Sequence, residues 1–325
     1  MESSNLSTLR EEAAAAEDEE LSPLPPPPPP PSDSASASAF SPDSIPPRPA
    51  SRYFMFIWLD QMDQLFFASM EVAILASKIK EKARVVAMDL RGHGKSSTEN
   101  DSDLSIETLC NDVLAVLKTM YGDSPPAIIL VGHSMGGSVA VHVAARKVMP
   151  NITGLVVVDV VEGTAMASLI HMQKILSSRM QHFPSIEKAV EWSVKGGPLR
   201  NVESARLSVP STLKYDESKK CYTYRTPLEE SERYWKGWYE GLSDKFLSCP
   251  VPKLLLLAGT DRLDRALTIG QMQGKFQMVV VRHTGHAIQE DAPEEFASYI
   301  LNFIGRNRIG PHGVEIPGLL RRSQQ

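Results

Sequence analysis

The sequence contains little cysteine and no long apolar segment. Its 325 residues include three cysteines, Cys110, Cys221 and Cys249, whose wide spacing matches no metal-binding pattern. An odd number of cysteines in a chain of this length indicates a reducing compartment. No apolar run approaches the roughly 18 residues that a membrane-spanning helix needs. These absences argue against a disulfide framework, a cysteine-bound metal and a membrane protein.

Excess positive charge and targeting signals are also lacking. The net charge is −5 and the pI is about 5.9, which argues against nucleic acid as the main partner. The first twenty residues, MESSNLSTLREEAAAAEDEE, are acidic. A signal peptide starts with positive charge, and a transit peptide contains few acidic residues. We therefore expect a cytoplasmic or nuclear protein.

The first part of the chain, residues 1–52, is rich in proline, serine and alanine. Such a composition cannot bury enough apolar surface to fold, so it predicts a disordered tail. Its run of prolines favours an extended left-handed helix, the conformation that SH3 and WW domains bind. A plain disordered tail fits the same composition better.

Further along, strand-like and helix-like segments alternate. Residues 105–122 carry apolar side chains at helical spacing, and residues 293–306 resemble a closing helix. The short runs that are apolar throughout are 83–90, 127–134, 154–161, 252–261 and 276–283. This alternation predicts an α/β fold with a mostly parallel sheet covered by helices on both faces. Between about 162 and 248 the pattern breaks, and we expect a helical cap that includes a polar loop at 213–235.

The stretch IILVGHSMGGSVAV (128–141) contains the motif G-x-S-x-G at Gly132, Ser134 and Gly136. The motif follows a buried strand and precedes a helix, which is the context of a nucleophile elbow. Small residues on both sides of the serine permit the sharp turn. We predict that Ser134 is a nucleophile and that the backbone N–H of Met135 stabilises the oxyanion.

A serine nucleophile needs a base and an acid that orients the base. His286 lies between the last strand and the last helix, where this fold places its base. We expect His283 to be a surface residue and His133 to be structural. The acid is open between Asp159 and Asp261, which each follow a strand, and the usual chain order favours Asp261.

Several stretches together resemble the protein phosphatase methylesterases, a family of α/β hydrolases. They include VVAMDLRGHGKSS, VGHSMGGSVAVH, VVDVVEGTAM, AGTDRLDRALTIGQMQGKFQM and GHAIQEDAP, and the resemblance covers residues 76–306. It implies hydrolysis of the methyl ester on the C-terminal leucine of the type 2A protein phosphatase catalytic subunit, without metal or cofactor. It also implies Ser134 as nucleophile, His286 as base and Asp159 as acid. Trp235 and Trp238 are candidates for a partner surface or for the core.

The resemblance divides the chain into the tail 1–52, a divergent segment 53–75, a hydrolase domain 76–310 and a tail 311–325. The divergent segment contains no His-Gly pair and is too short for the strands and the HGGG-type oxyanion loop that open the fold. We therefore expect the N-terminal strands and this loop to be missing. Two other functions stay open: a phosphatase-binding protein with weak or no activity, and a generic small-ester hydrolase.

Overall fold

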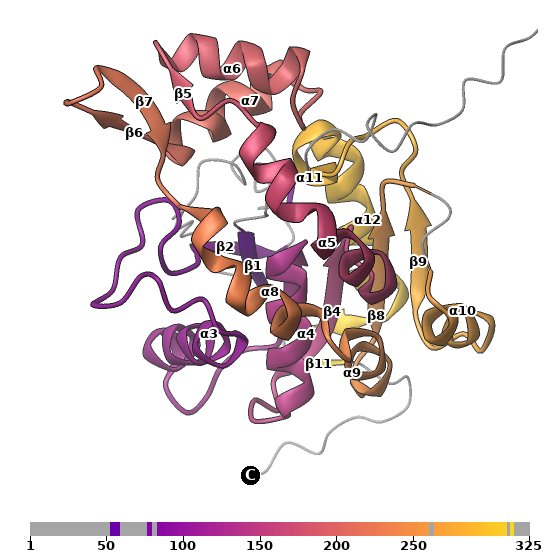
Figure 1. The fold of residues 1–325 in the computed structure, drawn as a ribbon. Coiled ribbons are helices and arrows are strands. Elements are labelled where there is room, and N and C mark those ends of the chain that lie inside the picture. The colour runs from indigo at the N-terminus through magenta and orange to yellow at the C-terminus, as the bar shows by residue number, and fades with distance from the viewer. Residues whose placement is uncertain (1–52, 59–76, 80–82, 260–262, 311–312, 315–325) are drawn as a thin grey trace, which may run out of the picture. The chain divides into compact units, whose positions relative to one another are not determined.

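A computed structural model describes residues 53–58, 77–79, 83–259, 263–310 and 313–314 (Figure 1). All of them belong to one compact unit, Pro46–Gln325. The predictions for the tail 1–52 and most of the segment 53–75 fall outside the described residues, as do those for Asp261 and nearly all of the tail 311–325.

A six-stranded sheet forms the centre of this unit, in the order β2-β1-β3-β4-β8-β9 (Figure 1). Within this sheet, the neighbouring strands β3, β4, β8 and β9 run parallel to one another. The strands are β1 (Tyr53–Trp58), β2 (Arg84–Asp89), β3 (Ile128–His133), β4 (Ile152–Val158), β8 (Lys253–Leu257) and β9 (Gln277–Val280). The predicted α/β class with a mostly parallel sheet is confirmed.

The strand β1 corrects in part the expectation that the N-terminal strands are missing. It pairs with both β2 and β3, and it runs antiparallel to both. Phe54 lies opposite Gly132, whereas Trp58 lies opposite Ile128. Its last residue is therefore at the end of the sheet away from Ser134. The sequence pattern did not predict this strand because strand pairing depends on distant partners more than on local composition.

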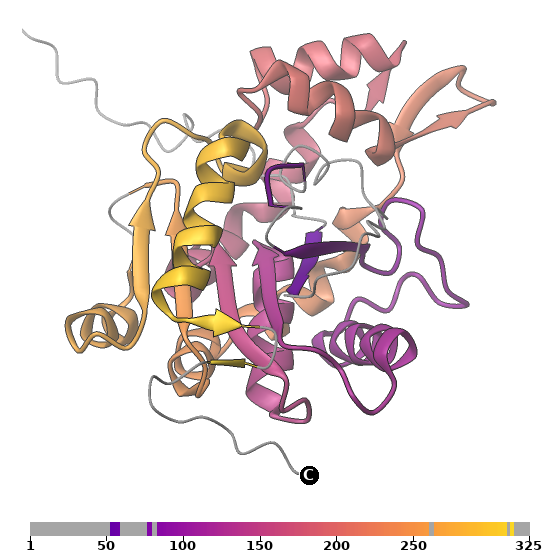
Figure 2. The same cartoon turned by 180° about the vertical axis from the view of Figure 1, so that it is seen from behind.

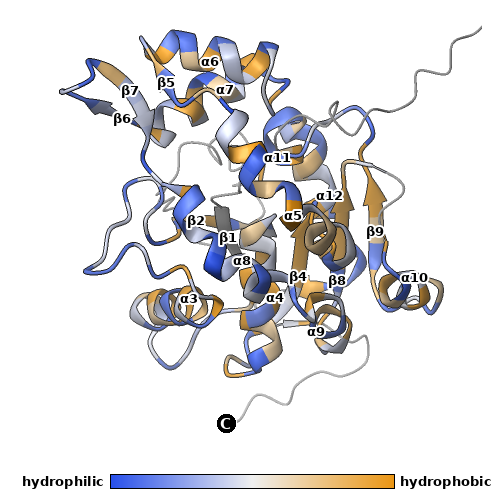
Figure 3. Cartoon of the chain, in the orientation of Figure 1, coloured by the Kyte–Doolittle hydropathy of each residue, from blue (hydrophilic) through white to orange (hydrophobic). Residues whose placement is uncertain are grey.

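The strands at the centre of the sheet are coloured as mostly hydrophobic in Figure 3. Their side chains enter two cores, one on each face, which explains why helices cover the sheet on both sides. In β4, Leu155 and Val157 face one core, while Val156 and Val158 face the other, as the two-residue period of a strand requires. The first core is completed by α3 (Ile106–Tyr121), α4 (Met135–Arg146), α9 (Leu242–Ser248) and α10 (Arg265–Met272). The second core is completed mainly by α12 (Pro293–Arg306), seen in Figure 2.

The insertion after β4 begins with the long helix α5 (Glu162–Ser178) and continues through α6 (Ile186–Lys195), α7 (Val202–Ser208) and α8 (Glu232–Tyr239). Two 3-10 turns, η3 (Val209–Thr212) and η4 (Leu228–Ser231), connect these elements. The prediction of a polar loop at 213–235 is wrong. Its first part is a hairpin of β6 (Leu213–Asp216) and β7 (Cys221–Tyr224), which β5 (His182–Phe183) extends.

The hairpin forms because its apolar side chains share one face. Leu213 is buried, and the rings of Tyr215 and Tyr222, a directly opposed pair, lie 5.1 Å apart. The charged residues between the strands concealed this pattern in the sequence. Among the described residues, no helix is both long enough and apolar enough to cross a membrane.

Candidate active site

Ser134 occupies a sharp turn between β3 and α4. Its backbone has φ 52° and ψ −119°, a conformation that L-residues rarely adopt, and its N–H donates to Val158 O at 2.9 Å. A Cβ on Gly132 would collide with the carbonyl of Gly136. A Cβ on Gly137 would lie 2.9 Å from both Gly132 O and Val160 Cγ1. The turn therefore also needs Gly137, a position that the motif alone does not include.

Asp159 and His286 form a buried pair. Asp159 follows β4 with φ 49°, and His286 lies in the loop between β9 and the short helix α11 (Ile288–Asp291). His286 Nδ1 lies 2.6 Å from Asp159 Oδ2, and both side chains are less than 10% exposed. The other oxygen, Asp159 Oδ1, accepts a hydrogen bond from the N–H of Ala258 at 2.9 Å.

The environment of Asp159 keeps its carboxylate ionised. Burial acts to raise its pKa, but the hydrogen bonds from His286 and Ala258 and the nearby imidazoles outweigh burial. The net effect lowers the pKa below its ordinary value. An ionised carboxylate at Nδ1 holds the proton of His286 on that nitrogen and leaves Nε2 free to accept one.

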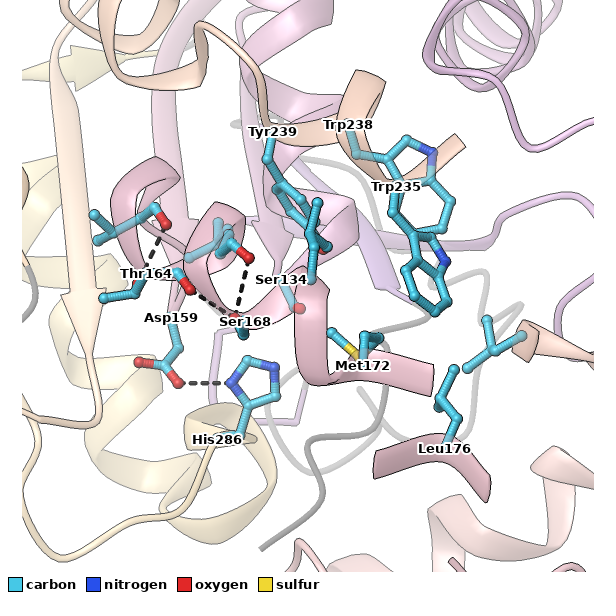
Figure 4. Close-up of a pocket in the computed structure, with 15 residues that line it drawn as sticks. Ser134, Asp159, Thr164, Ser168, Met172, Leu176, Trp235, Trp238, Tyr239 and His286 are labelled. Carbon is cyan, nitrogen blue, oxygen red and sulfur yellow. Dashed lines mark hydrogen bonds and ion pairs between the residues drawn. The ribbon is translucent and has the colours of Figure 1, made fainter. Parts of the chain in front are cut away.

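Ser134, Asp159 and His286 line the same cavity (Figure 4). Its volume is about 60 Å³. No hydrogen bond joins Ser134 to His286 in the described structure, so the two side chains share the cavity without direct contact of that kind. The remaining wall is mostly apolar and comes from α5, η4 and α8, with Leu169, Met172, Leu176, Leu228, Trp235 and Trp238 among its residues.

The N-terminus of α4 lies directly after Ser134, where the sequence predicts an oxyanion donor. Met135 is the first residue of this helix, and the first N–H groups of a helix have no partner within it. Together with the helix dipole, they favour negative charge beside Ser134. In α/β hydrolases a second donor comes from the loop after an early strand. Trp58, the last residue of β1, lies at the opposite end of the sheet, and the residues after it fall outside the described part of the chain.

The other residues singled out in the sequence have structural positions. His283 is exposed and pairs with Glu295, with 3.0 Å between Nε2 and Oε1. Trp235 and Trp238 are buried, and their indole N–H groups donate to Ser231 Oγ and Leu104 O at 2.7 Å each. The two tryptophans therefore belong to the core and the cavity wall, not to an exposed partner surface.

The three cysteines form no disulfide bond in the described part of the chain. Cys110 and Cys249 are buried and Cys221 is half-buried, all as free thiols. In that part of the chain, no group of three or more His, Cys, Asp and Glu side chains is arranged to hold a metal ion.

Comparison with known proteins first gives the class of this fold and site. The sequence model of the alpha/beta hydrolase family matches residues 56–299, so the chain is an α/β hydrolase. Among solved structures, E-2-(acetamidomethylene)succinate hydrolase superposes with a TM-score of 0.61 and 20% identity, covering 77% of this chain and 94% of that one. An esterase of M. tuberculosis superposes with a TM-score of 0.57 and 19% identity, covering 79% and 90%. These similarities concern the fold alone.

Sequence relatives then identify the particular family. Protein phosphatase methylesterase 1 of Mus musculus is 46% identical over 278 residues, which cover 73% of this chain and 72% of the relative. The Homo sapiens protein has the same identity and coverage, and that of Schizosaccharomyces pombe is 45% identical over 237 residues, 72% of this chain and 69% of the relative. The chain belongs to the protein phosphatase methylesterase family, and the resemblance found in the sequence is confirmed.

Proposed function

We propose that this chain hydrolyses the methyl ester on the C-terminal leucine of the type 2A protein phosphatase catalytic subunit. Ser134 is the nucleophile, His286 the general base and Asp159 the acid that orients it. The observation that carries the proposal is the cavity that Ser134 shares with the hydrogen-bonded pair of Asp159 and His286. Membership of the protein phosphatase methylesterase family supports the choice of ester.

The reaction proceeds in two stages. His286 Nε2 takes the proton of Ser134 as Oγ attacks the ester carbonyl, and the N–H of Met135 stabilises the resulting oxyanion. The imidazolium of His286 then protonates the methoxy oxygen as its bond to the acyl carbon breaks, and methanol leaves. A water molecule, activated by the same imidazole, hydrolyses the acyl-enzyme and restores Ser134 and the free carboxylate. Ser134 Oγ and His286 Nε2 must approach to hydrogen-bond distance when the substrate binds.

The apolar cavity wall suits an aliphatic acyl side chain. Met172, Leu176 and Leu228 line the cavity together with the ring of Trp235. A leucine side chain buried among them is removed from water, which favours binding by roughly 1.5–3 kcal/mol. A simple acetyl ester makes no such contact. Preference for a leucine methyl ester over an acetyl ester therefore separates this function from that of a generic small-ester hydrolase.

A phosphatase-binding protein with little or no activity is the second candidate. The observation that favours it is the direction of β1, whose last residue, Trp58, lies opposite Ile128 at the end of the sheet away from Ser134. Loss of one oxyanion donor lowers the rate about 10²- to 10³-fold. Such a chain would keep the phosphatase-binding surface and lose most turnover.

A fluorophosphonate probe, which reacts with activated serines, tests the two candidates. We expect the purified chain to be labelled and to release methanol from a peptide that ends in leucine methyl ester. Ser134→Ala should abolish both signals, whereas Ser248→Ala, at an exposed serine on α9, should abolish neither. A folded chain that is not labelled but retains the phosphatase catalytic subunit in a pull-down would support the binding protein instead.

A further inference from the structure

A second buried histidine holds the main chain of His286. His133, the last residue of β3, has its Nε2 2.7 Å from the carbonyl oxygen of His286. The centroids of the two rings lie 4.4 Å apart. His286 is thus held at two points: Asp159 bonds to its ring, and His133 bonds to its backbone.

The partners of His133 determine which nitrogen carries its proton. A carbonyl oxygen only accepts hydrogen bonds, so Nε2 must donate. Nδ1 lies 3.1 Å from the amide nitrogen of Gln289, which only donates, so Nδ1 must accept. His133 is therefore a neutral imidazole with its proton on Nε2. Burial, with a smaller contribution from the neighbouring His286, lowers its pKa to about 3 and keeps it neutral.

Burial of the Gln289 side chain costs free energy, because one of its polar atoms lacks a hydrogen-bond partner in the described part of the chain. This cost suggests that the amide has a functional role. It lies on α11, is 8% exposed, and its Oε1 has no hydrogen-bond partner among the described residues. Leaving a buried polar atom without a partner costs free energy that an apolar side chain of the same size would avoid. The benefit of the amide is its N–H group, which fixes the proton of His133 on the nitrogen that faces His286.

We propose that His133 and Gln289 are positioning residues for the base of the proposed reaction. They fix the backbone of His286, and Asp159 fixes its ring, so that Nε2 is aimed at the cavity that contains Ser134. The inference rests on the proposed function, since it assigns His286 the role of base. The inference also goes beyond the proposed function, because it assigns a role to His133 and Gln289, which do not contact the reacting atoms.

Two substitutions of similar size at Gln289 separate positioning from packing. Gln289→Met removes the donor to His133 Nδ1, and kcat should fall by about 10- to 100-fold with KM changed less than about twofold. Gln289→Glu places an acceptor there. A protonated His133 can donate a hydrogen bond both to the His286 carbonyl and to the new carboxylate at position 289. A neutral His133 has only one N–H for these two acceptors. The deficit of the Glu variant should therefore grow as the pH rises, while that of the Met variant should not.

The charged and titratable groups that face His133 are His286 and Asp159. The matched controls are Gln271→Met and Gln271→Glu, at an exposed position of α10. Equal effects of Met and Glu at position 289 at every pH, or kcat values within about twofold of the unmodified chain, would overturn the proposal.

A readout that does not depend on turnover keeps the proposal testable if the variants do not fold. Nitrogen-15 NMR should show that the imidazole assigned to His133 stays neutral between about pH 5 and 8, with its proton on Nε2. A His133 that titrates in this range, or that carries its proton on Nδ1, would refute the inference. An unmodified chain that fails to react with the fluorophosphonate probe but shows this imidazole would refute the proposed function and leave the hydrogen-bond assignment standing.

Discussion

Replacement of Asp159 by asparagine tests the assignment of the acid. The substitution preserves the size of the side chain, and asparagine tolerates the positive φ of 49° at this position. The two oxygens of Asp159 have different partners: Oδ1 accepts from the N–H of Ala258 and Oδ2 faces Nδ1 of His286. The side chain of asparagine has only one oxygen to offer these two partners.

The structure determines how that conflict resolves. The N–H of Ala258 can only donate, so it takes the amide oxygen, and the amide NH₂ is left facing His286 Nδ1. Nδ1 must then accept a hydrogen bond, so the imidazole proton moves to Nε2. A general base needs Nε2 without a proton, because that nitrogen takes the proton of Ser134. The same substitution in a serine protease triad lowers kcat about 10⁴-fold for this reason. We expect a loss of similar size with little change in stability.

The assay is methanol release from the leucine methyl ester peptide at about pH 7, with thermal melting as a check on folding. Asp261→Asn tests the alternative acid directly. Asp264→Asn is the control, because Asp264 bonds to Leu267 N and Ser243 Oγ and not to the site. If Asp159→Asn retains more than about a tenth of the activity and Asp261→Asn loses it, the assignment of Asp159 is refuted.

Two further predictions concern the turn and the response to acid. Gly132→Ala should prevent the elbow from closing, because the new Cβ meets the carbonyl of Gly136, and should lower the melting temperature sharply; Gly196→Ala, with open space around it, should not. His133 has its pKa lowered to about 3 by burial, so unfolding takes up a proton between pH 6.5 and about 3, and His133 should contribute a fall in stability of up to about 1.4 kcal/mol per pH unit as the pH drops through this range. Asp159, whose pKa is lowered, adds a loss of stability below about pH 3.8 as it becomes protonated. Urea unfolding at a series of pH values checks the slope, and a stability that is constant from about pH 7 to 5 would contradict the burial of a neutral His133.

The order of the sheet could be predicted only in part. The runs that became β3, β4 and β8 are apolar throughout, and their side chains alternate between two cores, so composition alone indicated buried parallel strands. β1 and the β6–β7 hairpin were not predicted. Their pairing is set by partners distant in the sequence, such as Gly132 opposite Phe54, and no local pattern records it.

The candidate site could also be predicted only in part from the sequence. Ser134 was predicted because an elbow is a local structure whose strand, glycines and helix are consecutive in the chain. The choice between Asp159 and Asp261 was not local, since both follow a strand, and family resemblance favoured Asp159. The contact of His286 with His133 joins positions 153 residues apart, and nothing in the spacing of the two residues indicated it.

The sequence by itself determined the α/β class, the turn at Ser134 and the family, because periodicity, glycine placement and motif identity are properties of consecutive residues. Only the tertiary structure decided which carboxylate meets His286, which way β1 runs, and that His133 contacts both the backbone of His286 and the amide of Gln289. These depend on hydrogen bonds between distant segments. Their 2.6–3.1 Å geometry arises only when β3, β4 and the loop before α11 pack together.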